Sequence, residues 1–188
     1  MYRAVAWRSL QLGIDLADRE KVSVVAKGLR LEFVPNEDGQ VLLVDGENVT
    51  PQLKSEVVGR GAAIVATYHE VRDIMTSKQR EIGRSGDVVM DGRDIGTIVF
   101  PEAEKKFFLD ADPEERGRRR YLELKAKNQD VDLAHIVEQV KQRDEEDRNR
   151  VIAPLRPAPD AVKVDTTFLK IEEVVEKVVH GIRACTDI

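Results

Sequence analysis

The amino-acid sequence predicts an α/β domain built on a parallel sheet. The 188 residues are 41% hydrophobic and 35% charged, a composition typical of a globular domain that buries a core. From residue 87 onward, short strand-like runs alternate with longer helical patterns. This alternation favours parallel pairing, because each helix returns the chain to the start of the next strand. No repeat or low-complexity segment interrupts the pattern.

The first segment, residues 1–18, predicts an amphipathic helix. Its sequence, MYRAVAWRSLQLGIDLAD, has Gly13 near the end and apolar side chains at helical spacing: Val5, Ala6, Leu10, Leu12 and Leu16. Met1 already lies inside the helical pattern, with no capping residue before it. Trp7 is expected to be an ordinary residue of a helix face.

A small antiparallel insert is predicted next, over residues 29–50. The runs LRLEF and QVLLV are strand-like, and the cluster Pro35-Asn36-Glu37-Asp38-Gly39 between them is typical of a turn. Two helices are then predicted, over residues 55–67 and 69–83.

The rest of the chain predicts strands and helices in alternation. The strand-like segments are DVVMDG (87–92), KKFFLDA (105–111) and AVKVDTT (161–167). Helices are predicted over residues 113–128, with Pro113 at the first helical position, over residues 133–150, and over residues 171–184. Pro154 and Pro157 prevent the second of these helices from continuing.

Composition excludes several classes of protein. The net charge of −5 argues against a sequence-independent nucleic-acid binder, which is normally basic. No apolar stretch is long enough to span a bilayer, and no signal-type segment follows Met1. The single cysteine, Cys185, rules out an internal disulfide and a cysteine-cluster metal site. We therefore expect a cytoplasmic protein with no nucleic-acid or membrane partner, whose arginines at residues 116–120 and 143–150 suit a small anionic ligand.

The helix predicted to end at Arg150 indicates a ligand-facing surface. Its apolar stripe consists of Leu133, Ile136, Val137 and Val140. Helical steps continue this face to Arg143, Asp147 and Arg150, so the inward stripe changes from aliphatic to charged without changing direction. The alternative is a ladder of the ion pairs Arg143–Asp147 and Glu146–Arg150, which contribute only about 0.2–0.5 kcal/mol each.

Three arginines share one face of the helix predicted over residues 113–128. Arg116, Arg119 and Arg120 lie at i, i+3 and i+4, so their guanidinium groups are expected to converge. Convergent positive charges require an anion, and phosphate oxygens match the fork of a guanidinium group. The alternative partners, within the protein, are Glu114, Glu115 and Glu123.

Charged residues at the end of the strand predicted over residues 87–92 also indicate a ligand site. Ligands of parallel α/β sheets bind beyond the carboxyl ends of the strands, where Asp91 is suited to hold a magnesium-bound water. Arg93 and Asp94 follow, and three ionised groups in one turn require partners. The histidines show no metal spacing and are expected on the surface or in helix packing: His69, His135 and His180.

Several motifs occur together along the chain. They are MYRA, DGENVT, HEVRDIMTSKQREI, DGRDIGTIVFPEAEKKFFLDADPEERGRRR, QRDEEDRNRVIAPLRPAPDAVKVDTT and IEEVVEKV. This combination, which covers essentially the whole chain, resembles the bacterial cytidylate kinase family, the (d)CMP kinases. The resemblance implies a P-loop NMP-kinase-like fold: a parallel sheet with flanking helices, a small antiparallel β insert and a lid. It implies a single domain over residues 1–188, an NMP-binding hairpin over residues 29–50 and a lid over residues 112–150.

The resemblance also implies transfer of the γ-phosphoryl group of ATP to CMP or dCMP, with Mg²⁺ as cofactor, by a protein that is monomeric when complete. The implied CMP-binding residues are Tyr2, Arg3, Arg72, Arg93, Asp94, Arg143, Asp147 and Arg150. Among these, Arg72 and Asp94 match the readers of cytosine, and Arg143 and Asp147 match the pair at the pentose. The implied catalytic residues are Arg93, Arg116, Arg120 and Arg150. Arg116, Arg119 and Arg120 are implied to contact ATP, and Asp91 to hold Mg²⁺ through water.

The sequence departs from the family's pattern in three respects. Ala63 stands where several relatives carry a serine that binds the base, and Lys54 stands where an arginine is common. The motif G-x-x-x-x-G-K-[ST], whose backbone amides cradle the β- and γ-phosphates, does not occur in the 188 residues. The chain therefore resembles a kinase begun late, without the first strands, and we expect little or no turnover from it.

Three alternatives remain open at this point. The chain could be a non-catalytic nucleotide-binding fragment, which binds CMP without using ATP. It could be a kinase for UMP or for several pyrimidine monophosphates. It could also be a structural α/β domain whose arginines are neutralised within the protein.

Overall fold

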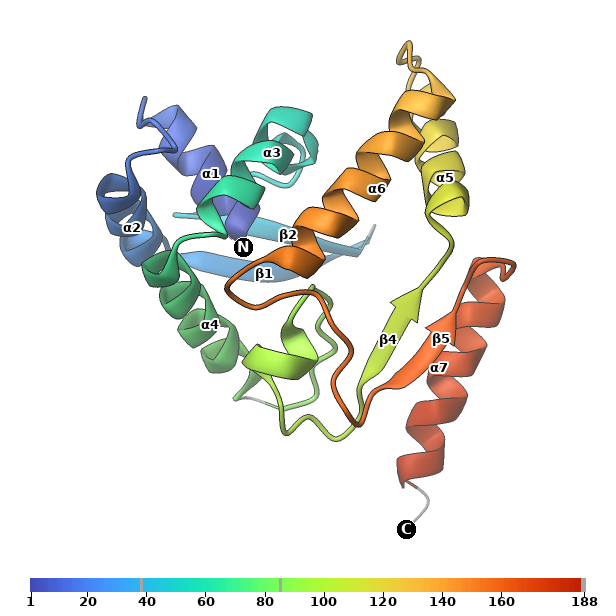
Figure 1. The fold of residues 1–188 in the computed structure, drawn as a ribbon. Helices are drawn as coiled ribbons and strands as arrows, with labels where there is room; N and C mark the ends of the chain where they lie inside the picture. Colours follow the sequence, from blue (N-terminus) through green and yellow to red (C-terminus); the bar gives the residue numbers. More distant parts are fainter. Residues whose placement is uncertain (38, 85, 187–188) are drawn as a thin grey trace. The chain divides into compact units, whose positions relative to one another are not determined.

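The computed structural model describes residues 1–37, 39–84 and 86–186, and the chain divides into two compact units, Met1–Val88 and Val89–Ile188 (Figure 1). The N-terminal unit combines helices with a three-stranded antiparallel sheet of order β1-β2-β3. Its elements are α1 (Tyr2–Gln11), α2 (Arg19–Gly28), β1 (Leu31–Asn36), β2 (Gly39–Val44), β3 (Glu47–Asn48), the 3₁₀ turn η1 (Gln52–Lys54), α3 (Glu56–Val65) and α4 (His69–Gly83).

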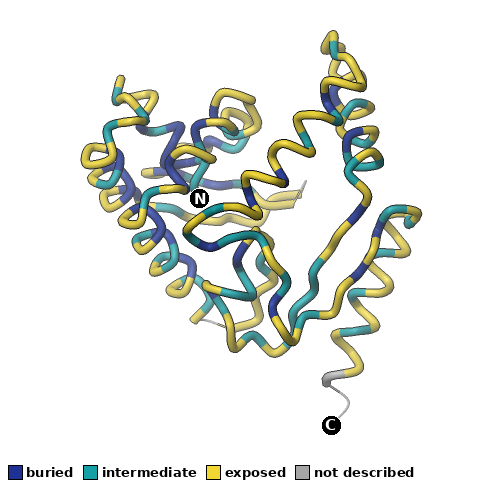
Figure 2. Tube along the Cα trace, in the orientation of Figure 1, coloured by how far each residue is buried: buried dark blue, intermediate teal, exposed yellow. Residues whose placement is uncertain are grey.

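The hydrophobic core of the N-terminal unit is formed by one face of each helix together with β2. Figure 2 shows buried residues along α1 and along the inner faces of α2 and α4. Side-chain caps begin two of these helices: Asp18 accepts a hydrogen bond from Lys21 N in α2, and Ser55 accepts one from Val58 N in α3. The fully buried side chains include Val5, Val22, Val44, Val65, Val71 and Met75.

The opening helix is shorter than predicted. α1 ends at Gln11, and Gly13 adopts φ +67°, a conformation that glycine reaches without the steric cost of a Cβ atom. Leu10 and Leu12 are exposed, so the predicted apolar face is wrong at these two positions. The buried side of α1 is made by Ala4, Val5, Ala6, Trp7 and Ser9.

The predicted antiparallel insert is present. β1 and β2 pair from Leu31↔Val44 to Asn36↔Gly39, and β3 extends the sheet through Leu43↔Asn48 and Val44↔Glu47. The predicted turn lies between β1 and β2, although Asp38 within it falls outside the described residues. The two helices predicted after the insert are confirmed as α3 and α4.

The C-terminal unit contains the parallel sheet. β4 and β5 pair in parallel from Phe107↔Val162 to Asp110↔Asp165, as the alternation of strands and helices predicted. The elements are the π-helical turn η2 (Ile95–Val99), β4 (Phe107–Asp110), α5 (Pro113–Ala126), α6 (Leu133–Asn149), β5 (Val162–Asp165) and α7 (Ile171–Thr186). Cys185 lies in α7, but its side chain is outside the described part of the structure.

The strand predicted over residues 87–92 does not form. Residues 88–90 have no strand assignment, and the Val89 side chain is 97% exposed. Within the described residues, β4 pairs only with β5, so this segment has no neighbouring strand with which to form a hydrogen-bonded ladder. An aliphatic run alone therefore did not suffice to predict a strand.

A glycine permits close packing between α5 and α6 in the C-terminal unit. A Cβ atom added to Gly117 would lie 2.5 Å from Cγ2 and 2.9 Å from Cα of Val137. The second distance involves backbone, so the two helices would have to separate.

We expect Gly117→Ala to lower the free energy of unfolding by about 1–2 kcal/mol, because overpacking outweighs the gain in helix propensity. Chemical denaturation measures this change. The matched control is Gly28→Ala in α2, where an added Cβ atom would meet no other atom within 4 Å. Equal stabilities of the two variants would contradict the close approach of α5 and α6.

Candidate nucleotide-binding site

The N-terminal unit places three of the predicted CMP-binding residues on α1 and α4. Arg72, in α4, is only 4% exposed, and its Nη1 donates a hydrogen bond to the carbonyl oxygen of Ala66 at 3.1 Å. Its guanidinium carbon lies over the ring of Tyr2, 5.5 Å from the ring centroid, which is within the range of a cation–π contact. The first residue of α1 is thus in contact with a buried arginine of α4.

Arg3 is held next to these residues by backbone carbonyl groups. Its Nη1 donates to Leu53 O at 2.6 Å and to Ser55 O at 3.4 Å. A Cβ atom on Gly59 would lie 3.1 Å from Arg3 Nη2, so a glycine at this position of α3 leaves room for the guanidinium group. The N-terminal unit therefore holds both predicted arginines at fixed points.

In the C-terminal unit, a buried carboxylate lies between two guanidinium groups. Asp147, near the end of α6, is 2% exposed; its Oδ2 lies 3.4 Å from Arg93 Nε, and its Oδ1 pairs with Arg150 Nη2. Oδ2 is buried and accepts no hydrogen bond from any residue that the structure describes. A buried carboxylate oxygen in this state is suited to accept a hydrogen bond from a ligand hydroxyl group.

Positive charge is concentrated around Arg93. Partial burial lowers the pKa of the Arg93 guanidinium, and the positive charge of Arg143 lowers it further, whereas Asp144 opposes the shift. Arg93 remains protonated at neutral pH because the ordinary pKa of arginine is so high. The shift indicates that an anion placed beside Arg93 would be stabilised.

The two carboxylates in the turn over residues 91–94, Asp91 and Asp94, differ in exposure. Asp94 is buried and begins the turn η2, where its backbone oxygen accepts the amide hydrogen of Ile98 at 2.9 Å. Asp91 is exposed. Nowhere in residues 1–37, 39–84 and 86–186 do three or more His, Cys, Asp or Glu side chains gather as a metal site. The histidines were predicted to lie on the surface or in helix packing, and all three are exposed: His69, His135 and His180.

The inward face of α6 differs from the prediction at two positions, of which the first is Leu133, which is exposed. Asp147 is buried as predicted, but Arg143 is exposed, and Asp144 takes the inward place. The reason is that the buried stripe advances four residues from Val140 rather than three. Asp144 is therefore a site residue that the sequence reasoning missed, and its spacing from Ile136 and Val140, at i+8 and i+4, is the signal that could have found it.

Asp144 neutralises one of the three arginines predicted to converge. Arg116 Nη1 donates to Asp144 Oδ1 at 2.8 Å, Nη2 donates to Oδ2, and Nε donates to Ala111 O at 2.9 Å. This bidentate pair lowers the pKa of Asp144 and raises that of Arg116. The carboxylate of α6 thus fixes a guanidinium of α5 beyond the end of β4.

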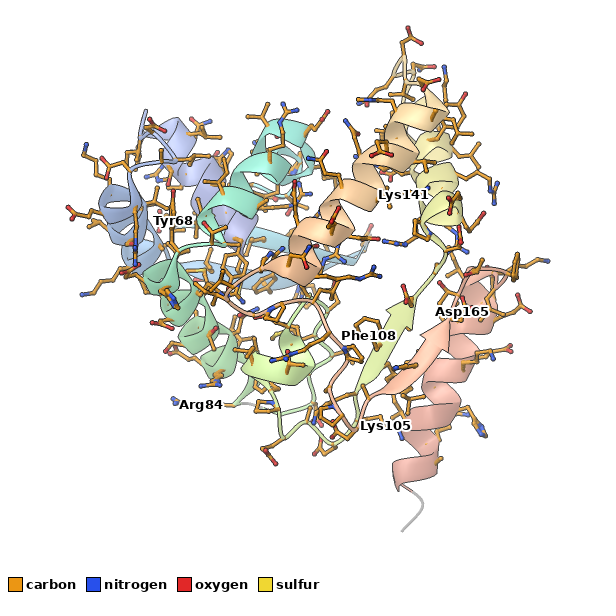
Figure 3. The ribbon with its side chains drawn as sticks, viewed as in Figure 1. Tyr68, Arg84, Lys105, Phe108, Lys141 and Asp165 are labelled. Atoms are coloured by element: carbon orange, nitrogen blue, oxygen red, sulfur yellow. The ribbon has the colours of Figure 1, made fainter. Side chains whose placement is uncertain are left out.

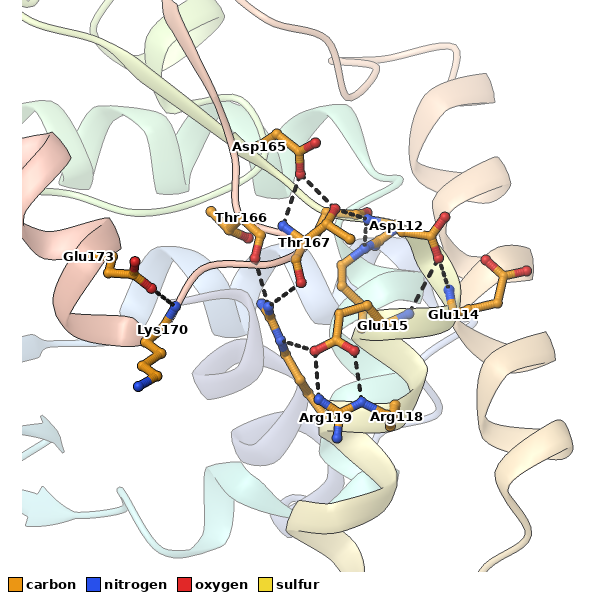
Figure 4. A network of polar contacts seen from close by, with 12 residues as sticks. Asp112, Glu114, Glu115, Arg118, Arg119, Asp165, Thr166, Thr167, Lys170 and Glu173 are labelled. Carbon is orange, nitrogen blue, oxygen red and sulfur yellow. Dashed lines mark hydrogen bonds and ion pairs between the residues drawn. The ribbon is translucent and has the colours of Figure 1, made fainter.

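Arg119 and Arg120 have different partners, so the three guanidinium groups do not converge. Arg119 donates to Glu115 Oε1 at 2.9 Å and to the carbonyl oxygen of Thr166 at 2.6 Å, whereas Arg120 donates to Glu123 Oε2 at 2.7 Å. Figure 4 shows that Glu115 and Arg119 belong to a network joining the start of α5 to the segment after β5. The predicted lid helix is therefore attached to the carboxyl edge of the parallel sheet.

A second cross-link joins the two helices of the predicted lid. Lys141 is labelled on α6 in Figure 3, and its Nζ lies 2.6 Å from Glu114 Oε1 of α5. Both groups are largely exposed, so this pair adds little to stability at ordinary salt concentrations. The contacts at Asp144 and Gly117 are better protected from water and hold the two helices together.

The carboxylate of Glu115 gives the C-terminal unit a stability that depends on pH. The hydrogen bond from Arg118, and then that from Arg119, lower the pKa of Glu115 from 4.5 to about 2, against the opposing effect of desolvation. A carboxylate whose pKa is lower in the folded state stabilises the fold above its unfolded pKa, and this contribution is lost as the pH falls through the folded pKa.

We therefore expect wild-type stability to fall between about pH 4.5 and pH 2, and to fall less steeply in Glu115→Gln. Thermal unfolding across this window measures the difference. Glu102→Gln, which alters an exposed carboxylate of the same unit, is the control and should follow the wild type. Parallel curves for wild type and Glu115→Gln would contradict the role of these hydrogen bonds.

These features define a class of protein. A parallel sheet whose carboxyl edge leads into arginine-bearing helices, with a buried carboxylate beside two guanidinium groups, is typical of an α/β protein that binds a small phosphorylated ligand. No helix in the described part of the chain combines the length and apolar character needed to cross a bilayer.

Comparison with known proteins identifies the family. The family model described as cytidylate kinase matches residues 1–184. The chain is 44% identical over 182 residues to a cytidylate kinase of Pseudomonas paraeruginosa (strain DSM 24068 / PA7), covering 96% of this chain and 80% of the relative. It is 43% identical over 184 residues to the cytidylate kinase of Stutzerimonas stutzeri (strain A1501), covering 97% and 80%. The chain belongs to the cytidylate kinase family, and the predicted P-loop NMP-kinase fold class is confirmed.

Proposed function

We propose that this protein is a (d)CMP kinase, a phosphotransferase that moves the γ-phosphoryl group of ATP to CMP or dCMP and forms CDP or dCDP. The observation that supports the proposal is the buried Asp147 carboxylate, which lies beside Arg93 and Arg150 and has one oxygen that accepts no hydrogen bond from the described residues. A pentose hydroxyl group would satisfy that oxygen, and a phosphate group would compensate the two guanidinium groups. Membership of the cytidylate kinase family supports the same assignment.

The remaining roles are those that the resemblance to cytidylate kinases implies, and the chemistry of the ligand supports them. Arg72 and Asp94 read the cytosine base, because a guanidinium group donates to the ring nitrogen and carbonyl while a carboxylate accepts from the exocyclic amino group. Tyr2, Arg3, Arg93 and Arg150 contact the monophosphate, and Arg143 and Asp147 contact the pentose. Arg93 and Arg150 together with Arg116 and Arg120 neutralise the transferred phosphoryl group, whose charge is dispersed in the transition state.

The triphosphate group of ATP is assigned to α5, the first helix of the predicted lid. Arg116, Arg119 and Arg120 contact ATP in this proposal, and their present pairs with Asp144, Glu115 and Glu123 must rearrange or be shared for them to do so. Mg²⁺, when bound, neutralises phosphate oxygens. The exposed Asp91 carboxylate would hold it through water, in keeping with the preference of Mg²⁺ for few carboxylates and several waters.

The oligomeric state, the location and the kind of substrate of the enzyme are also proposals. We propose a monomeric, cytoplasmic enzyme that acts on free nucleotides and not on nucleic acid. The net charge of −5 supports a small-molecule substrate.

Calorimetric titration of the 188-residue protein with CMP, dCMP, UMP and AMP tests this function. We expect CMP and dCMP to bind more tightly than UMP and AMP. Preference for UMP would instead establish a kinase of different base specificity. ADP formation from CMP and ATP is a separate measurement, and because the 188 residues contain no G-x-x-x-x-G-K-[ST] motif, we expect little or none. CMP binding with little ADP formation is therefore the expected result for the 188 residues, and robust ADP formation would refute the expectation of low turnover.

A further inference from the structure

The ring of Tyr2 and the guanidinium group of Arg72 form a contact between helices that are distant in the sequence. Tyr2 begins α1, Arg72 lies in α4, and the guanidinium carbon is 5.5 Å from the ring centroid. The ring is half-buried and packs against the hydrophobic core of the N-terminal unit, so its position is set by that core. A fixed ring face next to a buried cation restrains the orientation of the cation.

A second restraint acts on the same guanidinium group. Arg72 Nη1 donates to the carbonyl oxygen of Ala66 at 3.1 Å, and the whole residue is only 4% exposed. The carbonyl fixes one end of the planar fork, whereas the ring of Tyr2 restrains rotation of the plane about that end. Loss of the ring would leave the hydrogen bond in place and remove the restraint that the ring supplies.

We propose that Tyr2 is a positioning residue for base selection, whose ring holds Arg72 in the orientation that distinguishes cytosine from uracil. The proposal rests on the proposed function, in which Arg72 reads the base. It differs from a contact between the Tyr2 hydroxyl and the monophosphate, because it assigns the role to the ring.

Orientation matters because a guanidinium group only donates hydrogen bonds. Cytosine presents acceptors at its ring nitrogen N3 and at its carbonyl O2, whereas uracil presents a donor at N3 and a further acceptor at O4. A guanidinium held in place against N3 and O2 meets a donor in uracil and rejects it. One that rotates can move to O4, so uracil becomes an acceptable ligand.

The experiment compares Tyr2→Leu with Tyr2→Phe by calorimetric titration with CMP and with UMP. Leucine removes the ring, whereas phenylalanine removes only the hydroxyl group. We expect Tyr2→Leu to lower the ratio of CMP affinity to UMP affinity by about three- to tenfold, which corresponds to about 0.7–1.4 kcal/mol and lies within the range of a cation–π contact. Tyr2→Phe should retain the wild-type ratio, even if it weakens binding of both nucleotides.

The control variant is Tyr121→Leu. Tyr121 lies in α5, where Lys125 Nζ is 5.7 Å from its ring centroid, so the change removes a similar ring–cation contact outside the proposed base site. It should leave the ratio unchanged. Tyr2→Met is a second ringless variant, for use if leucine does not fit the packing around α1.

The nuclear magnetic resonance spectrum of the Arg72 side chain tests the contact independently of binding. We expect its Nε–Hε proton to carry a ring-current shift in the wild type and in Tyr2→Phe, and to lose it in the ringless variants. If both ringless variants fail to fold, the wild-type spectrum alone tests the contact. The exposed Arg60 serves as the reference without a ring contact, so an Arg72 Nε–Hε proton with the same chemical shift as that of Arg60 would overturn the contact.

The possible outcomes separate this inference from the proposed function. If the wild type binds UMP as tightly as CMP, the proposed function fails, and with it the role of Tyr2 in base selection. If the wild type prefers CMP and Tyr2→Leu keeps that preference, only the positioning role fails. If Tyr2→Phe and Tyr2→Leu lose affinity for both nucleotides equally, the hydroxyl group and not the ring is what matters, and the inference is overturned.

Discussion

Asp147→Asn is expected to lower the free energy of unfolding by about 3 kcal/mol at neutral pH. The carboxylate is 2% exposed and lies against Arg93 and Arg150, so asparagine would leave two guanidinium groups facing a neutral amide. Removal of one partner from a buried ion pair typically costs about 3–5 kcal/mol. We expect the lower end of this range, because Arg93 retains access to water through 43% of its side chain.

Chemical denaturation of wild type and variant measures this change. The matched control is Glu114→Gln, since Glu114 also pairs with a cation, Lys141 at 2.6 Å, but the two side chains are 59% and 44% exposed. Its loss should cost far less than the loss of Asp147, because its carboxylate stays in contact with water. Added CMP should stabilise the wild type more than Asp147→Asn, because asparagine replaces one carboxylate oxygen with an NH₂ donor and its remaining oxygen is an uncharged, weaker acceptor for the pentose. An Asp147→Asn protein as stable as the control would show that Asp147 does not compensate the two arginines.

Arg72→Lys is expected to weaken CMP binding by about thirtyfold while UMP binding changes much less. Lysine keeps the positive charge but lacks the planar fork that donates two parallel hydrogen bonds. A hydrogen bond from a charged group contributes about 1.5–3 kcal/mol, and about 2 kcal/mol corresponds to a factor of thirty in affinity. Because Arg72 is 4% exposed, little water is available to replace the lost contact.

Calorimetric titration with both nucleotides measures the effect of Arg72→Lys. Arg60→Lys is the control, since Arg60 also lies on a helix of the N-terminal unit and pairs with Glu56 while remaining 70% exposed. It should bind both nucleotides as the wild type does. If Arg72→Lys lost CMP and UMP affinity in equal measure, Arg72 would serve the phosphate or the fold and not the base.

Elements with a clear hydrophobic period were predictable from the sequence. α4, with Val71 and Met75 buried on one face, has nearly the predicted boundaries, and so do the strands of the insert, which the turn cluster separates. In such segments the spacing of hydrophobic residues indicates which side of the helix or strand faces the core. The strand predicted over residues 87–92 failed because a strand also needs a neighbour, and a run of aliphatic residues does not specify one.

The site was predictable in its residue types and less so in its pairings. Asp147 and Arg150 were placed on an inward face from helical spacing alone, and they lie together. Arg143 and Asp144 are adjacent in the sequence, and only the packing of α6 against α5 selects which of them turns inward. The partner of Arg116 lies 28 residues further along the chain, a separation at which helical periodicity carries no information.

The central claim is that these arginines and aspartates bind a pyrimidine monophosphate, and a crystal structure of the protein grown with CMP tests it most directly. We expect phosphate oxygens within hydrogen-bonding distance of Arg93 and Arg150, a pentose hydroxyl group donating to Asp147 Oδ2, and the cytosine edge against Arg72. A CMP molecule bound away from these four residues, or crystals in which saturating CMP leaves them without a ligand, would contradict it.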